Sequence, residues 1–138
     1  MCKQYMKSTV LFLRVAILSI AIGIILGAFG AHALKEFFSD YETDIWNKGI
    51  FYQITNSLGL ILIILLIKNN LLKESKLAIL LLCLGIVFFS GSLYTIALTN
   101  VFLSPNHWLK LITIPVTPIG GTLIIASWII CFFKLNTK

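Results

Sequence analysis

The chain has 138 residues, of which 59% are hydrophobic and 12% charged, and its formal net charge is +6. A soluble domain of this length has too little interior to bury so much apolar surface, so lipid must solvate most of the side chains. The basic residues lie singly at the ends of apolar segments instead of forming one patch. This pattern is typical of a membrane protein, and we expect no nucleic-acid partner. The length predicts a single transmembrane domain over residues 1–138.

Four apolar segments predict membrane-spanning helices at about residues 9–33, 50–67, 77–98 and 112–133. Each can cover the ~30 Å of hydrocarbon that takes ~20 helical residues. Apolar residues cover every side of these segments, which indicates helices immersed in lipid. The predicted fold is therefore all-α, an integral membrane four-helix bundle in a lipid bilayer. Ala31-His32-Ala33 has the form of a signal-peptidase site, but the apolar run before it is longer than a signal peptide needs.

The basic residues divide unevenly between the two sides of this bundle. The N-terminal flank, the second loop and the C-terminal tail hold Lys3, Lys7, Arg14, Lys68, Lys73, Lys76, Lys134 and Lys138, whereas the first and third loops hold Lys35, Lys48 and Lys110. Because Lys and Arg are enriched in cytoplasmic loops, this distribution predicts that both termini are cytoplasmic.

Small residues recur at four-residue spacing in the first segment. Small side chains at that spacing let another helix approach closely, and this partner is either a helix of the same chain or a second copy. The small residues that we expect at helix contacts are Gly23, Gly27, Ala31, Gly91, Gly120 and Gly121.

Polar residues of all four segments fall at a similar depth, toward the end opposite the termini. An unpaired amide in hydrocarbon is costly, so Gln53 and Asn56 should face other helices and find partners. Two interpretations are open: the cluster holds the helices together by hydrogen bonds, or it lines a small outward-facing pocket for a solute or lipid headgroup. The candidate residues are His32, Tyr52, Gln53, Asn56, Ser90, Ser92, Tyr94 and Thr117.

Two prolines interrupt the fourth segment, at Pro115 and Pro118. Each proline removes a backbone donor and disturbs the preceding turn, so a continuous helix would be kinked. In the alternative, the helix is broken and begins at Pro118 with Thr117 as its N-cap, and residues 104–116 form an interfacial or re-entrant segment.

The spans offer little for catalysis. They contain no carboxylate, which argues against proton-coupled transport. A serine hydrolase would need Ser90 or Ser92 activated by an oriented base, and His32 is the only histidine at the edge of a predicted span that could serve. The sequence has no CxxC, no metal-spaced histidine pair and no phosphate-binding loop. We therefore expect no enzyme, no cofactor and no metal site.

Several short motifs follow one another in a distinctive order. They are Gly27-Ala28-Phe29-Gly30-Ala31-His32-Ala33-Leu34-Lys35, Tyr52-Gln53, Phe89-Ser90-Gly91-Ser92-Leu93-Tyr94, Thr117-Pro118-Ile119-Gly120-Gly121 and Trp128. Together they resemble the YgdD/YwdK family, a domain-of-unknown-function family of small bacterial membrane proteins with animal relatives. The resemblance covers nearly the whole chain and implies four transmembrane helices, a bacterial inner-membrane location and no established activity. Asn56 stands where the family often has a histidine, which argues against a site built on two histidines.

The sequence thus predicts a multi-pass protein of the inner (plasma) membrane that acts as a structural or interaction component, with a second copy or another membrane protein as partner. The alternative is a small solute- or lipid-headgroup-binding or channel-like protein that uses the polar cluster.

Overall fold

The computed structural model describes residues 2–104 and 107–136. Lys138 and the side chains of Lys3 and Lys7, which enter the count of basic residues, lie outside what it describes. The helices are α1 (Cys2–His32), α2 (Asp40–Lys68), α3 (Lys76–Phe102) and α4 (Trp108–Phe133). All four are long and apolar enough to cross a membrane, which confirms the all-α membrane fold.

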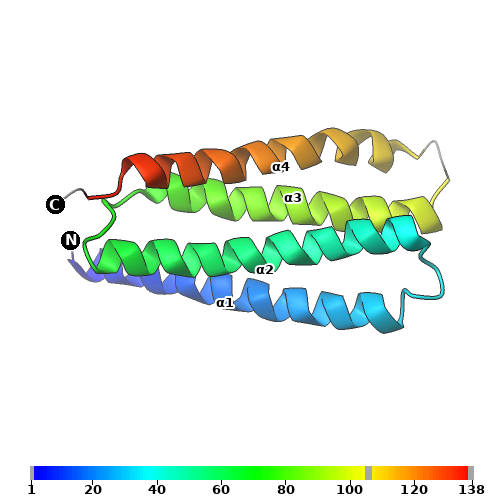
Figure 1. Cartoon of the computed structure of the whole chain (residues 1–138), viewed down its shortest axis with the longest axis horizontal. Coiled ribbons are helices and arrows are strands. Elements are labelled where there is room, and N and C mark those ends of the chain that lie inside the picture. Colours follow the sequence, from blue (N-terminus) through cyan, green and yellow to red (C-terminus); the bar gives the residue numbers. More distant parts are fainter. Residues whose placement is uncertain (1, 105–106, 137–138) are drawn as a thin grey trace.

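The helices contact one another in chain order, α1 with α2, α2 with α3, and α3 with α4. Neighbouring helices run antiparallel, and the N- and C-terminal ends lie at the same end of the molecule (Figure 1). The α3–α4 contact is the most extensive and the α1–α2 contact the least of the three. Helix α1 is therefore the least enclosed element of the fold.

Large apolar side chains face outward along every helix. Ile25 of α1, Leu111 of α4 and Phe133 at the end of α4 are 66%, 73% and 78% exposed. A soluble protein would not leave so much contiguous apolar surface in water. These side chains are instead solvated by hydrocarbon, as the composition predicted.

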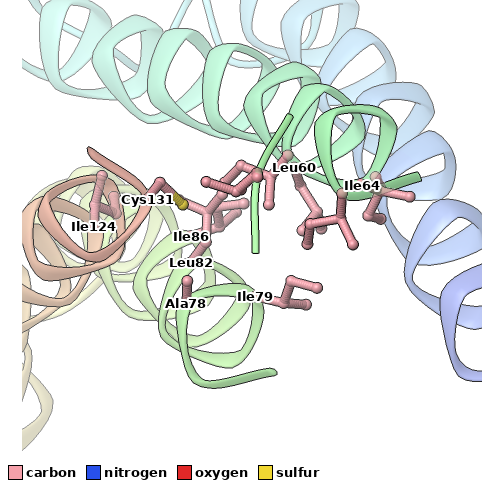
Figure 2. Close-up of a cluster of buried hydrophobic side chains, with 12 residues drawn as sticks. Leu60, Ile64, Ala78, Ile79, Leu82, Ile86, Ile124 and Cys131 are labelled. Carbon is pink, nitrogen blue, oxygen red and sulfur yellow. The ribbon is translucent and has the colours of Figure 1, made fainter. Parts of the chain in front are cut away.

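Two apolar clusters form the interior. The larger one lies toward the terminal end and joins Leu60 and Ile64 of α2, Leu82 and Ile86 of α3, and Ile124 of α4 (Figure 2). The smaller one lies at the opposite end and is formed by Leu34, Ile45, Trp46 and Ala97. Between these two clusters, along α2 and α3, lie Gln53, Asn56, Ser57, Ser92 and Tyr94.

Helix α2 begins at Asp40, ahead of the predicted span that starts at residue 50. Ser39 is its N-cap, and the Glu42 carboxylate accepts a hydrogen bond from the Ser39 backbone N–H at 3.2 Å, which completes a capping box. The Asn100 amide near the end of α3 donates to the same carboxylate at 3.3 Å. The capping box thus extends the helix beyond the hydrocarbon and ties α2 to α3.

Helix α4 runs without a break through Pro115 and Pro118. The alternative in which the helix begins at Pro118 and residues 104–116 are re-entrant is wrong. The N-cap is His107, whose Nδ1 accepts from the Leu109 N–H at 3.3 Å. Thr117 is not an N-cap, because it lies inside α4, and its hydroxyl contacts Ser92 of α3 at 2.7 Å.

Helix α4 packs closely against α3 beside its two prolines. Each proline removes one intrahelical donor, and neighbouring helices can compensate for that loss. Gly120 lies directly against the backbone of α3: a Cβ added there would be 2.3 Å from the Phe89 nitrogen and 2.8 Å from its Cα. A Cβ at Gly85 of α3 would in turn meet the Gly120 oxygen at 3.1 Å. The two backbones therefore approach closely where the prolines weaken α4.

This contact predicts that Gly120→Ala lowers the stability of the protein markedly. The new methyl group would overlap backbone atoms of α3, which cannot move to another rotamer as a side chain can. Overpacking of this kind costs about 1–3 kcal/mol. Thermal melting in detergent would measure the change. Gly91→Ala is the matched control, because a Cβ at Gly91 meets no atom within 4 Å. Equal melting temperatures for the two variants would contradict the assigned contact.

Candidate functional site

The polar side chains of the spans form several hydrogen-bonded groups at one level of the fold. The first group is centred on Gln53 of α2, which is 7% exposed. Its Nε2 donates to the Ser19 carbonyl of α1 at 2.8 Å, and its Oε1 accepts from the Tyr94 hydroxyl of α3 at 2.8 Å. Ser57 Oγ donates to Ser19 Oγ at 2.8 Å. One glutamine thus links three helices, as expected of an amide in hydrocarbon.

Asn56 forms the second group and connects α2 to α4. Its Nδ2 donates to the Tyr52 carbonyl one turn earlier at 2.9 Å, and its Oδ1 accepts from the Trp128 indole N–H at 3.2 Å. Trp128 reaches α2 because Gly59 leaves room for its ring: a Cβ at Gly59 would be 2.5 Å from Cζ2. The Trp128 ring therefore covers the amide.

Ser92 and Thr117 form the third group, between α3 and α4. Ser92 Oγ donates to the Phe89 carbonyl at 2.8 Å and lies 2.7 Å from Thr117 Oγ1. A serine hydroxyl carries a single hydrogen, so Thr117 is the donor in the second bond. This bond lies beside the close approach at Gly120 and fixes the level at which the two helices meet.

The structure does not bring the remaining candidates into these groups. His32 is exposed at the end of α1. Tyr52 is 40% exposed, and its ring packs edge-on against Phe89 with centroids 4.7 Å apart. Ser90 is 2% exposed, and its hydroxyl has no hydrogen-bond partner within the described part of the chain. Neither serine that we considered as a nucleophile is paired with a histidine, because Ser92 bonds Phe89 and Thr117.

We call the level of the three hydrogen-bonded groups around Gln53, Asn56 and Ser92 the polar level. A groove of about 420 Å³ lies beside it, between α1 and α3. Its floor comes from α2, with Gln53, Ser57 and Leu60. Ser90 and Gly91 belong to the α3 wall. The groove exists because α1 and α3 are both held against α2 and make little contact with each other.

The expected helix-packing residues divide into two sets. Gly23 and Gly27 face α2, where an added Cβ would meet Ile54 Cγ1 at 2.8 Å and Ile50 Cδ1 at 3.8 Å. A Cβ added at Gly121 would lie 3.4 Å from Cε2 of the Phe89 ring, beside the contact made by Gly120. These glycines pack within the chain. Gly91 has open space in front of it, and Ala31 is exposed, so neither makes a close helix contact in this chain.

Sequence reasoning missed several residues of these networks. Ser19 is the only residue with a hydroxyl group in the apolar stretch 15–29. Its position there could have indicated that it bonds a polar group on another helix. Ser127 of α4 donates to the Ala78 carbonyl of α3 at 2.7 Å, near the terminal end of the fold. Trp46 donates to the Leu26 carbonyl of α1 at 2.9 Å. Within residues 2–104 and 107–136, no cluster of three or more His, Cys, Asp or Glu side chains could hold a metal ion.

Four apolar helices, joined by buried interhelical hydrogen bonds, define a multi-pass integral membrane protein. Residues 26–121 match the model of the family described as "Protein of unknown function (DUF423)", and the chain belongs to this family. The match supports the resemblance to YgdD and YwdK.

The relatives are named as membrane proteins. A UPF0382 membrane protein of Staphylococcus haemolyticus is 41% identical over 86% of this chain and 89% of its own length. UPF0382 membrane protein YwdK of Bacillus subtilis is 32% identical over 86% of this chain and 89% of its own length. UPF0382 inner membrane protein YgdD of Escherichia coli is 33% identical over 78% of this chain and 75% of its own length. No solved structure matches the chain.

The family and the four spans together make this chain a multi-pass inner-membrane protein of a family to which no specific activity is attached. The protein is embedded in the lipid bilayer.

The Gln53 network predicts that Tyr94→Phe destabilises the protein. The substitution removes only the hydroxyl and leaves Gln53 Oε1 without its donor. Interhelical bonds in membranes contribute ~0.6 kcal/mol on average and up to ~1.7, and we expect a loss of about 1 kcal/mol. Tyr52→Phe is the control, because within residues 2–104 and 107–136 its hydroxyl makes no hydrogen bond, and its ring is partly exposed. Thermal melting of both variants measures the difference; a larger effect from Tyr52→Phe would contradict the network.

Proposed function

We propose that this inner-membrane protein is a structural or interaction component that is not an enzyme, and that both of its termini are cytoplasmic. The observation that carries this proposal is the use of the polar level for contacts between helices. Gln53, Asn56, Ser92 and Thr117 each bond a group on another helix of the same chain. Polar groups that serve helix contacts are not free to line an aqueous path.

Asn56 is the most informative of these residues. It is 5% exposed, its Nδ2 donates to its own helix, and its Oδ1 accepts from Trp128. A channel or an outward-facing solute site would need such an amide in contact with water. Its enclosure favours the interpretation in which the cluster holds the helices together.

The outer face of α1 is where a partner would bind under this proposal. Helix α1 packs against α2 along one side only, and Ile17, Ile24 and Ile25 are 59%, 61% and 66% exposed. Gly23 and Gly27 are already used by α2, so a second copy or another membrane protein would meet large apolar side chains instead of the glycines.

Thiol labelling in intact cells tests the sealed polar level. In a chain without Cys2, Cys83 and Cys131, we expect that a membrane-impermeant reagent does not label Asn56→Cys. We expect it to label Asp40→Cys, which is exposed at the first-loop end of α2.

Denaturation in SDS provides the control, since Asn56→Cys should react fully once the helices separate. Labelling of Asn56→Cys in intact cells would show water at the polar level and overturn the proposal. Absence of labelling at Asp40→Cys would show that the first loop faces the cytoplasm and that the orientation is inverted.

A second candidate function is the binding of a lipid-soluble ligand, and the groove between α1 and α3 favours it. Among the residues that the structure describes, the buried Ser90 hydroxyl has no hydrogen-bond partner, and it belongs to the wall of this groove, where a ligand oxygen would satisfy it.

Gly91→Leu would fill the groove, since a Cβ at this position meets nothing within 4 Å. Under this second function, native mass spectrometry should find a small molecule bound to the wild-type protein and absent from Gly91→Leu. The same bound mass on both proteins would exclude the groove as its site.

A further inference from the structure

At the terminal end of the fold, the loop between α2 and α3 is held in place by backbone hydrogen bonds to the segment that follows α4. Residues 69–75 join α2 to α3, and Leu72 forms an isolated antiparallel bridge with Leu135, just beyond α4. The Lys73 N–H donates to the Lys134 carbonyl at 2.9 Å, and the Asn136 N–H donates to the Leu71 carbonyl at 3.0 Å. These bonds fix the connection against the C-terminal segment, so the side chains of Lys73 and its neighbours project from a defined backbone.

A cavity of about 670 Å³ lies between this connection and the adjacent part of α1. Val10 and Leu13 of α1 and Ile64 and Leu65 of α2 give it an apolar wall. Its polar lining residues are Thr9, Lys68, Asn70, Lys73, Glu74 and Asn136. A smaller hollow of about 180 Å³ shares Thr9, Ile64, Ile67 and Glu74 with it and reaches Lys76 at the start of α3. The volume falls within the range of small-molecule sites, ~300–1,000 Å³.

The cavity lies at the depth of lipid headgroups. Helix α2 has 29 residues and is therefore about 43 Å long, close to the ~40–45 Å of a bilayer with its headgroup regions. Its last residue is Lys68, and α3 begins at Lys76. The lysines therefore lie at the membrane surface, while the apolar wall extends from them into the hydrocarbon.

The charge at this cavity is positive. Three lysines and one carboxylate line it and the adjoining hollow: Lys68, Lys73, Lys76 and Glu74. Within the described residues, the only ion pair joins Lys48 to Asp44 at the opposite end of α2, so none of these three lysines forms an ion pair among those residues. Lys134 donates to the Glu74 carbonyl at 3.1 Å, which adds a fourth cation nearby. The positive end of the α3 dipole lies here as well.

From this combination we propose that the cavity binds an anionic phospholipid, with its phosphate between Lys68 and Lys73 and an acyl chain along Val10, Leu13, Ile64 and Leu65. A zwitterionic lipid would bring its own cation toward the lysines, so its electrostatic attraction to the cavity would be weaker. A free phosphate would leave the apolar wall unused. A second copy of this chain would present the same basic surface, and like charges would repel. The site lies at the opposite end of the spans from the first loop and is separate from the polar level.

Native mass spectrometry of the whole chain in detergent tests this site. The protein would be titrated with dioleoylphosphatidylglycerol, which is anionic, and with dioleoylphosphatidylcholine, which has the same acyl chains and no net charge. We expect one tightly bound phosphatidylglycerol and at least tenfold weaker binding of phosphatidylcholine. In the double variant Lys68→Gln/Lys73→Gln, binding of phosphatidylglycerol should weaken about 30-fold, since each lysine near anionic lipid is worth ~1 kcal/mol and ~1.4 kcal/mol is tenfold.

The control variant Lys35→Gln/Lys110→Gln removes the same charge from the other end of the spans and should retain the wild-type affinity. Lys73→Arg should also retain it, because the cation and the backbone bond to Lys134 remain. Equal weakening in the two double variants would mean that net charge alone attracts the lipid. Equal affinity of the protein for phosphatidylglycerol and phosphatidylcholine would mean that no anion site exists. Either result overturns the proposal. Displacement of the lipid by inorganic phosphate at similar concentration would also overturn it, since the acyl chain would then contribute nothing.

Discussion

Hydrocarbon offers no hydrogen bonds, and this constraint determines how the interior of the protein is built. An amide or hydroxyl inside a span is costly to leave without a partner on its own helix or on a neighbour, and within the described residues Ser90 is the buried exception. Gln53 meets the constraint by bonding α1 and α3 at once, and Asn56 meets it by bonding its own helix and Trp128 of α4. The two apolar clusters on either side of these residues consist mainly of hydrocarbon side chains, although Trp46 donates to the Leu26 carbonyl in one and Ser127 donates to the Ala78 carbonyl in the other. The polar level therefore sets the register of the helices, and the apolar clusters supply contact area.

Close approach between backbones is the second requirement, and glycine provides it. Gly120 brings α4 against the backbone of α3 at Phe89, and Gly59 admits the ring of Trp128 against α2. Attraction between helices in lipid depends on such contacts, because hydrocarbon is as apolar as a leucine side chain. Gly91 contributes no contact and instead leaves the groove open between α1 and α3. The same residue type thus closes one interface and keeps another open.

The fold is correspondingly asymmetric. Helices α3 and α4 form the firmest pair, and α1 is held by α2 along one side. The groove and the basic cavity both border α1, because this helix leaves α3 uncovered at the middle of the membrane and leaves the α2–α3 connection open at the surface. Both hollows therefore lie on the α1 side of the molecule, while exposed apolar side chains face lipid along every helix.

The sequence by itself determined the class, the number of helices and the depth of most polar groups, because apolar length and residue position along a helix are local properties. It also indicated that Gln53 and Asn56 must be paired. It could not choose the partners, since Ser19, Tyr94 and Trp128 are brought to them only by the packing of α1, α3 and α4. Local rules allowed a break at Pro118, but α4 is continuous and packs against α3 beside the prolines, through the backbone contact at Gly120 and the bond from Thr117 to Ser92. Partner choice depends on residues far apart in the chain, so tertiary structure decided it.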